Sequence, residues 1–433
     1  MTHEPGGIYR SPDHGASRAP AAATPPSGPA PEAAPPHPPA PPAPGVAAVP
    51  PAPHAPPAPH APPAPHAVAA PPAGWAPPAP AAPPDGPPQV AAWPAGYPPA
   101  QPPVPAPSLA PPRPAPDGSA EVTTLIRVAD EISKVVVGQD QVIAGLLISL
   151  LCGGHVLLEG VPGVAKTLLV RALAASLALE DKRVQFTPDL MPGDVTGSLI
   201  FDARTAAFAF REGPVFTNLL LADEINRTPP KTQSALLEVM EERQVTVEGR
   251  PRPLPEPFLV AATQNPVEYE GTYPLPEAQL DRFLFKLTVP LPGREQEIGV
   301  LRAHHTGFDP RDLDSAGVTA VATAADLAAA RQAVRQVGVA DVVLAYIVDL
   351  CRATRAAPSV ELGVSPRGGT AVLHAAKARA WLAGRDFVTP DDVKAVAQPA
   401  LRHRIRLRHE AELEGATPDS VLASILLTVP TPR

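Results

Sequence analysis

Short apolar runs that alternate with helical segments are the feature that most restricts the fold of this chain. The runs are HVLLE, RVQF, TNLLLADE, FLVAATQNP and FKLTV, which begin at positions 155, 183, 217, 258 and 285. Residues 165–179 and 229–243, which lie between them, have helical periodicity, and the second segment starts with prolines whose missing N–H costs nothing there. Apolar strands alternating with helices predict an α/β fold with a parallel sheet covered on both faces.

Two segments interrupt this alternation, and a different pattern follows it. Residues 198–216 and 244–255 are predicted to be hairpins, the second turning near Gly249. Past Pro292 the strand pattern stops, and we expect a small helical domain. One of its helices is expected to start at Pro390, with Thr389 as its N-cap. The predicted domains are 119–292 and 293–433. The helices expected in the second domain are 293–305, 323–336, 340–356, 366–384 and 418–428.

The first 118 residues have a different composition from the rest. They contain 43 of the 66 prolines, three arginines, no lysine and five carboxylates. Because so little apolar surface can be buried and proline blocks helices and ladders, we predict that residues 1–118 are disordered and partly polyproline II. The APPAPH repeat places His54, His60 and His66 about 19 Å apart along such a helix, too far for one metal ion. A solvated spacer is the favoured interpretation, and docking of PxxP segments is the alternative.

The sequence suggests a cytoplasmic protein. The start, MTHEPGGIYR, lacks the basic and apolar parts of a signal peptide. Residues 142–158 are free of acidic, Lys and Arg residues, but the run is slightly short for a membrane span and Gly153 and Gly154 interrupt it, so we expect a buried helix followed by a buried strand. Cys152 and Cys351 are expected to be buried free thiols in a reducing compartment.

Charge argues against a dedicated nucleic-acid binder. Residues 119–433 carry 32 basic and 38 acidic side chains, a net charge of −6. The basic run RHRIRLRH at 402–409 is interpreted as a solvated or subunit-facing part of the helical domain, with phosphate-backbone binding as the alternative. Aromatic residues are only 4% of the chain, so base stacking is not supported. The sequence has no Cys/His set at metal-ligand spacing and no Ser-His-Asp arrangement.

The stretch GVPGVAKT, which ends at Thr167, is nearly the phosphate-binding loop G-x-x-x-x-G-K-[ST] and lies between a predicted strand and helix. Gly160 and Gly163 let the backbone bend so that N–H groups converge on phosphate oxygens. Lys166 can reach the β and γ phosphates, and the Thr167 hydroxyl can ligate Mg²⁺. Ala165 replaces the usual glycine, and we expect it in the first turn of the helix with right-handed geometry.

Polar side chains end two further strands. Asp223 and Glu224 close LLLADE, at the carboxyl end of a buried strand where open α/β sheets bind ligands. Asp223 is placed to hold Mg²⁺, and Glu224 to orient a water for attack on the γ-phosphate. Asn265, after the next strand, can hydrogen-bond that water or a γ-phosphate oxygen, although taken alone it is a turn residue before a proline. Arg282 and Arg367 are candidates for the cation that phosphoryl transfer needs, against the alternative of solvated surface arginines.

The combination of VVVGQDQVI, GVPGVAKT, LLLADEINR, ATQNP, EAQLDRF and SPRGG resembles the MoxR family of AAA+ ATPases over nearly all of 121–433. The usual loop of that family also has alanine before the lysine. The resemblance implies a P-loop core with a parallel sheet and a helical lid, assembled as a ring, by expectation a hexamer. It further implies Mg²⁺-dependent ATP hydrolysis coupled to chaperone-like remodelling of protein clients, often with a von Willebrand factor A-domain partner.

The resemblance also assigns roles to residues. Arg367 would be sensor 2 and bind ATP from the lid of its own subunit, and Arg282 would be a finger that reaches the neighbour's site, with Arg227 as the other candidate. Asn265 would be sensor 1, and the two hairpins would be insertions that project toward the pore or face of the ring. Contacts to the nucleotide are implied for the adenine segment Val137, Gly138 and Gln139, for the Walker A residues Gly160, Val161, Pro162, Gly163, Val164, Ala165, Lys166 and Thr167, and for the Walker B pair Asp223 and Glu224.

Two other functions remain open from the sequence. One is a nucleic-acid motor or loader built on the same ATPase core. The other is a nucleotide-gated scaffold in which the proline-rich tail recruits partners. Both keep the nucleotide site and differ in what it drives.

Overall fold

The computed structural model describes residues 108–110, 119–204, 206–265 and 272–432. The three histidines of the repeat, His54, His60 and His66, lie outside the described residues. The predicted disorder of 1–118 is wrong for Ser108–Ala110, because Leu109 finds apolar neighbours and is 95% buried in the main core.

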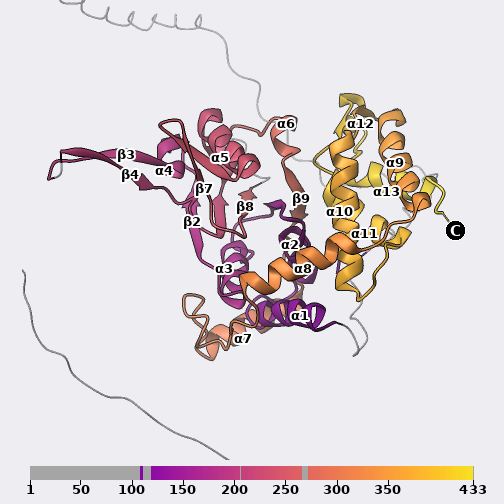
Figure 1. Cartoon of the computed structure of the whole chain (residues 1–433). Helices are drawn as coiled ribbons and strands as arrows, with labels where there is room; N and C mark the ends of the chain where they lie inside the picture. Colours follow the sequence, from indigo (N-terminus) through magenta and orange to yellow (C-terminus); the bar gives the residue numbers. More distant parts are fainter. Residues whose placement is uncertain (1–107, 111–118, 205, 266–271, 433) are drawn as a thin grey trace, which may run out of the picture. The chain divides into compact units, whose positions relative to one another are not determined.

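A parallel sheet of five strands forms the centre of the first domain, which confirms the predicted α/β fold (Figure 1). The order is β2-β5-β8-β1-β9, so consecutive strands are joined by crossovers. The central strands are apolar and buried, whereas β2 at the edge alternates exposed and half-buried residues. The strands are β1 His155–Glu159, β2 Asp181–Gln185, β5 Leu219–Asp223, β8 Leu259–Gln264 and β9 Phe283–Thr288.

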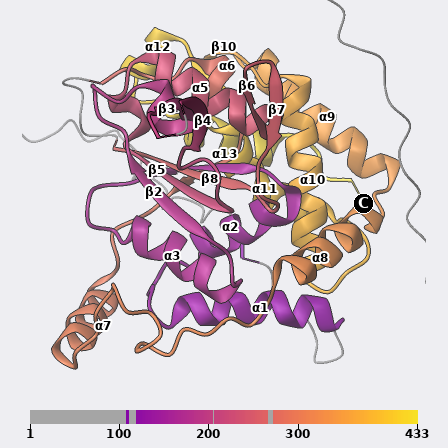
Figure 2. The same ribbon diagram turned by 60° about the vertical axis from the view of Figure 1, so that its left-hand side comes forward.

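Each face of the sheet buries its own set of side chains. Val156 and Leu158 of β1 join the larger cluster together with α1 to α3, whereas Leu157, between them, joins the smaller cluster with α5. This alternation follows from the strand period of two, and it covers both faces as predicted. The covering helices are α1 Ala120–Ser133, α2 Asp140–Cys152, α3 Lys166–Ser176, α4 Pro192–Thr196 and α5 Pro230–Glu242, with the 3-10 turn η1 Ile225–Arg227 and α6 Glu277–Leu280 nearby (Figure 2).

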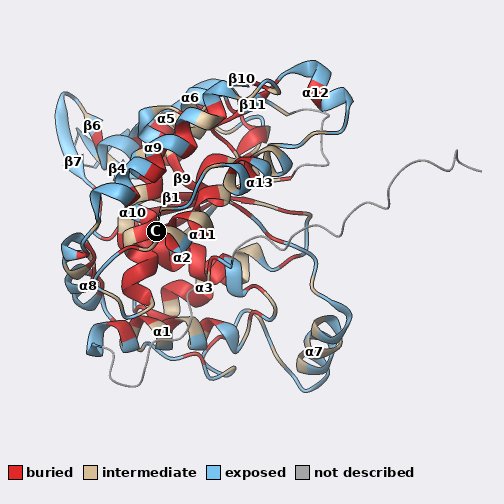
Figure 3. Ribbon diagram, turned by 90° about the vertical axis from the view of Figure 1, so that its right-hand side faces the viewer, coloured by how far each residue is buried: buried red, intermediate tan, exposed pale blue. Residues whose placement is uncertain are grey.

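The uncharged run before the phosphate loop folds as predicted. Helix α2 is buried almost along its whole length and ends at Gly153, whose φ of 63° starts the turn into β1 (Figure 3). No helix in the described part of the chain is long and apolar enough to cross a membrane. Cys351 is buried and Cys152 is half-buried, and both are free thiols. Burial raises the pKa of Cys152 to about 12.

Both predicted hairpins are present. The first, β3 Gly197–Asp202 and β4 Ala207–Glu212, extends away from the rest of the domain (Figure 1). The second, β6 Gln244–Val247 and β7 Arg250–Pro253, turns through Glu248 and Gly249 at φ values of 50° and 75°. Two successive positive φ angles are the geometry of a tight hairpin turn, which is why glycine is there.

Helices dominate after β9, and the predicted cap at Thr389 is confirmed, since its side chain accepts from the Asp392 amide. The lid is not entirely helical, however: β10 Val360–Leu362 pairs with β11 Arg406–Leu407, which lies inside the basic run. Short strands of two or three residues leave no periodicity to detect. The division at 292 remains a proposal. The helices are α7 Arg294–His305, α8 Ala324–Gln336, α9 Asp341–Ala356, α10 Pro366–Leu382, α11 Pro390–Leu401, α12 His409–Leu413 and α13 Pro418–Thr428.

Candidate active site

The loop between β1 and α3 is tightly folded. A Cβ added at Gly160 would lie 2.7 Å from the carbonyl oxygen of Val289, so a larger residue does not fit. Gly163 has a φ of 86° and open space around it, which leaves room for a ligand against its backbone. The Lys166 ammonium donates a hydrogen bond to the Gly160 carbonyl at 2.8 Å. Contacts within the protein therefore hold the loop and the lysine in a curved arrangement.

Ala165 does not have the right-handed geometry expected from the sequence. It is the N-cap of α3 with φ 63° and ψ 24°, in the left-handed region. The prediction was wrong because Ala165 is the cap that precedes the first turn of α3, and a cap residue does not take helical angles. A left-handed conformation costs an L-residue about 1–2 kcal/mol, which the surrounding structure supplies.

The carboxylate of Asp223 is engaged on both oxygens. Its Oδ1 accepts a hydrogen bond from the Thr263 hydroxyl at 2.5 Å, and its Oδ2 lies 2.7 Å from a guanidinium nitrogen of Arg183. The Thr263 hydroxyl also accepts from the main-chain N–H of Glu224 at 2.9 Å. One threonine on β8 thus fixes both members of the acidic pair at the end of β5.

Glu224 is the second strained residue of the site, with a φ of 56°. One of its carboxylate oxygens accepts from the Gln185 amide at 2.7 Å and pairs with Arg227 at 3.1 Å. Arg227 therefore lies beside the acidic pair of its own chain.

The strand ends meet at one cavity of about 890 Å³, a volume suited to a nucleotide. Asn265, only 5% exposed, follows β8 and lines it. Gly138, Gly160 and Val161 are not in its wall. The predicted residues that line the cavity are Val137, Gln139, Pro162, Gly163, Val164, Ala165, Lys166, Thr167, Asp223, Glu224 and Asn265.

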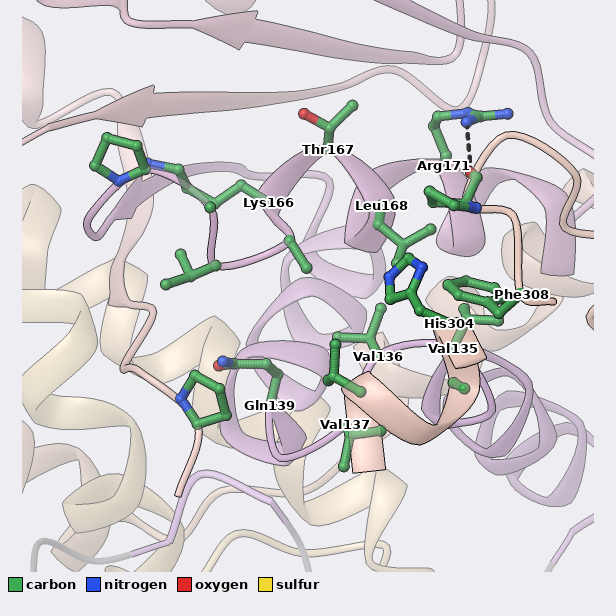
Figure 4. A pocket seen from close by; sticks show the side chains of 18 of the residues that line it. Val135, Val136, Val137, Gln139, Lys166, Thr167, Leu168, Arg171, His304 and Phe308 are labelled. Atoms are coloured by element: carbon green, nitrogen blue, oxygen red, sulfur yellow. Dashed lines mark hydrogen bonds between the residues drawn. The ribbon is translucent and has the colours of Figure 1, made fainter. Parts of the chain in front are cut away.

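The other end of the cavity is apolar. Figure 4 shows Val135, Val136 and Val137 on one side, with His304 and Phe308 approaching them from α7 and the turn after it. The His304 and Phe308 rings pack edge to face with centroids 5.4 Å apart. An apolar wall with aromatic rings suits the flat base of a nucleotide, while the loop and acidic pair suit its phosphates.

Two other residues support this wall: Arg171, which belongs to none of the predicted motifs, and Gly138 of the predicted adenine segment. Arg171 of α3 donates to the carbonyl oxygens of Pro310 and Arg311 at 2.9 and 3.1 Å, which holds the turn after Phe308 against the cavity (Figure 4). Gly138 has a φ of 76°, and a Cβ there would collide with the Gln296 side chain. The missing side chain at Gly138 therefore leaves room for Gln296 to pack behind this part of the wall.

Some of the site residues that had not been predicted do have a signal in the sequence. Thr263 stands two positions before Asn265 in a strand already singled out, and Arg183 and Gln185 are alternate residues of a predicted strand, so both face the same side. His304 and Phe308 follow the predicted domain boundary and belong to no motif. Only the folded chain shows that they reach the cavity.

Arg282 and Arg367 lie at the other end of the sheet, where its strands begin. They line a second cavity of about 260 Å³ beside Gly154, at the amino ends of β1 and β9. Arg282 Nε and Arg367 Nη1 reach the two oxygens of Glu241 at 2.9 and 3.3 Å. Arg367 does not line the larger cavity of its own chain in this structure, because a five-residue strand separates the two ends of the sheet by about 16 Å.

The basic run is partly internal. Arg404 is 8% exposed; its Nε donates to Asp281 at 2.6 Å, and its other nitrogens reach main-chain carbonyls of β9, including that of Phe283. His403 is buried beside it and also contacts the Phe283 carbonyl. These side chains join the lid to the sheet, so the interpretation of the run as solvated or subunit-facing was wrong for them, and they are not available to a phosphate backbone.

Sheet order, phosphate loop, acidic pair and following helical domain together define a P-loop ATPase of the AAA+ class. The described residues contain no group of three or more His, Cys, Asp or Glu side chains that could hold a metal by themselves. Thr167 and Asp223 both line the cavity and are the residues that could hold Mg²⁺ beside phosphate oxygens, since Mg²⁺ usually keeps several waters.

Comparisons with known proteins agree with this class. A family described as "ATPase family associated with various cellular activities (AAA)" matches residues 155–285, and the AAA lid domain matches 352–425. The chain is 43% identical to Chaperone MoxR1 of Mycobacterium tuberculosis over 333 residues, 75% of this chain and 86% of that protein. It is 49% identical to the uncharacterized protein YeaC of Bacillus subtilis over 306 residues, 71% of this chain and 94% of that protein.

A solved structure shows the same likeness. The crystal structure of a "putative ATPase" from Cytophaga hutchinsonii matches with a TM-score of 0.67 and 42% identity. The match covers 72% of this chain and 96% of that one. The chain belongs to the MoxR family of AAA+ ATPases, as its motifs predicted, and it is an ATPase.

Proposed function

We propose that this ATPase binds ATP with Mg²⁺ in the larger cavity, hydrolyses it between subunits of a ring, and uses hydrolysis to remodel partner proteins. The observation that carries the proposal is the convergence of three strand ends on one cavity: the loop after β1, the acidic pair after β5 and Asn265 after β8. Open α/β sheets bind their ligands at such strand ends.

The side chains divide the work. Lys166 exchanges the Gly160 carbonyl for the β and γ phosphates, and Thr167 and Asp223 hold Mg²⁺, which neutralises charge on the phosphate oxygens when bound. Glu224 orients the attacking water and accepts its proton, while Gln185 fixes the carboxylate by the 2.7 Å hydrogen bond. Asn265 contributes a neutral amide toward the γ-phosphate.

Arg282 and Arg367 supply positive charge to the neighbouring subunit. Both lie at the amino-terminal ends of the strands, away from the phosphate loop of their own chain. Both pair with a single carboxylate, Glu241. Two arginines that meet one carboxylate can meet one phosphate in the same way. A closed ring places this edge of one subunit against the cavity of the next, and by family likeness the ring is a hexamer.

Remodelling of clients is inferred from the relative named Chaperone MoxR1 and from the β3–β4 hairpin. Phe201 and Phe208 at its exposed end are 54% and 69% exposed and pack edge to face with ring centroids 5.4 Å apart. Exposed aromatic side chains on a projecting hairpin are suited to contact a protein client, directly or through a von Willebrand factor A-domain partner.

The test compares ATP binding and hydrolysis in Glu224→Gln with Glu238→Gln, an exposed glutamate on α5, as the control. Glu224→Gln should bind ATP and hydrolyse it at least about 100-fold more slowly, because positioned acid–base groups contribute about 10²–10⁴. A normal rate would overturn the role of Glu224. Mixing Lys166→Ala with Arg282→Ala subunits should restore part of the turnover, and no restoration contradicts action between subunits.

A further inference from the structure

Three residues of the proline-rich N-terminal region, Ser108–Ala110, contact both helix α2 of the core and helix α10 of the lid. Gln141, in the first turn of α2, holds them from one side. Its Oε1 accepts from the main-chain N–H groups of Leu109 and Ala110 at 2.5 and 3.3 Å, and its Nε2 donates to the Ser108 hydroxyl at 2.7 Å. One side-chain amide thus makes contacts with all three residues.

Leu109 is the buried residue of the three. It is 5% exposed and belongs to the main hydrophobic cluster. A Cβ added at Gly145 of α2 would lie 2.7 Å from Leu287 and 3.1 Å from Leu109 Cδ2, so the missing side chain at Gly145 leaves space for both leucines. The contact therefore combines burial of a large apolar side chain with hydrogen bonds to the backbone on either side of it.

The lid contributes a contact of its own. Arg379 of α10 donates from Nη2 to the Ser108 carbonyl at 3.1 Å. This arginine is 8% exposed, and its Nη1 pairs with the fully buried Asp392 at 2.6 Å. The segment accordingly contacts a rigidly held lid side chain and a core helix at once.

The sequence explains why the contact falls here. Leu109 is the single leucine among the first 118 residues. Ser108, Leu109 and Ala110 are also a run of three residues with N–H groups between Pro107 and Pro111, and proline offers none. An apolar anchor and adjacent donors occur together at this point of a region otherwise rich in Pro and Ala.

We propose that Ser108–Ala110 is a strap: a docking segment by which the proline-rich region is fixed, within the same chain, to the junction of core and lid, tying α10 to α2. The strap does not depend on the proposed function.

Hydrogen exchange on the full-length chain tests the strap, because the amides of Leu109 and Ala110 are the donors and the flanking prolines contribute none. These two amides should exchange at least about tenfold more slowly than in a free chain. Gln141→Ala should remove the protection. Gln141→Glu, which keeps the acceptor, should restore it, and Gln336→Ala, at an exposed glutamine of α8, should leave it unchanged.

A second measurement tests the tie between the helices. Leu109→Asp should speed exchange in α2 and α10 together and leave α5 unchanged, since α5 packs on the other face of the sheet. Free-chain exchange of the two amides in the wild type would overturn the strap itself. Unchanged exchange in α10 after Leu109→Asp would overturn its role in joining lid to core.

Discussion

Arg183 and Asp223 face each other across β2 and β5, with two guanidinium nitrogens 2.7 and 3.2 Å from the same carboxylate oxygen. Thr263 engages the other oxygen. Because arginine does not lose its proton, a divalent cation that uses Asp223 as a ligand has to displace or tolerate a fixed positive charge. Arg183 therefore competes with Mg²⁺ for Asp223 in the proposed site.

The first prediction follows from this competition. Arg183→Gln should lower the Mg²⁺ concentration that gives half-maximal ATPase activity by about two- to fivefold, because a partly exposed ion pair contributes about 0.2–1 kcal/mol. Arg211→Gln removes the same charge from the exposed hairpin strand β4 and is the control. A midpoint that stays unchanged or rises in Arg183→Gln contradicts the competition.

The second prediction concerns the left-handed alanine. Ala165→Gly should leave the free energy of unfolding unchanged or raise it by up to about 1 kcal/mol, because relief of the positive φ offsets the added entropy of the unfolded chain. Ala175→Gly, inside α3, should lower it by about 1 kcal/mol. Chemical denaturation of both variants decides, and equal losses at the two positions would show that Ala165 is not strained.

Residues that are neighbours in sequence were the predictable part of the site. The loop ending at Thr167 and the pair Asp223 and Glu224 each follow an apolar strand, so strand pattern and motif place them at the same edge of a sheet. Parallel strands bring their carboxyl ends together whatever the order of the strands. The placement of Asn265 at this edge follows from the same rule.

Residues whose position depends on the lid were not predictable. Arg367 follows the start of α10, and the side of the sheet it reaches is set by contacts such as Arg404 with Asp281, 123 positions apart. No local pattern encodes such a pairing. The geometry of Ala165 was missed for another reason: alanine normally indicates right-handed backbone, and here the turn into the helix overrides that preference.

The third prediction tests the apolar end of the cavity. Phe308→Ala should weaken ATP binding by about tenfold, equivalent to about 1.4 kcal/mol, with little change in the turnover rate at saturation, because the ring would contact the base and not the reacting phosphates. Phe387→Ala removes a 54% exposed ring from the lid and serves as the control. A drop in kcat with unchanged ATP affinity would place Phe308 outside the base site.

The last prediction concerns His155 at the start of β1. Its Nδ1 accepts from the Val260 N–H at 2.9 Å and its Nε2 lies 3.0 Å from the Met240 carbonyl, so the imidazole is neutral and joins β8 to α5. Burial lowers the pKa of His155 from 6.5 to about 4, although the Met240 contact opposes the shift. The unfolded chain therefore binds this proton at a higher pH than the folded chain does.

Stability from this group is fully present above pH 6.5 and is lost as the pH falls toward 4. One pKa unit corresponds to about 1.4 kcal/mol, so the loss attributable to His155 approaches about 3 kcal/mol. The free energy of unfolding, measured with urea, should fall less between pH 7 and pH 4.5 in His155→Asn than in the wild type. In His409→Asn, at an exposed histidine, it should fall as much as in the wild type. Equal losses in His155→Asn and the wild type would mean that His155 is not held neutral by the fold, and the pH dependence would then have to come from other groups, such as buried His403, whose pKa burial also lowers.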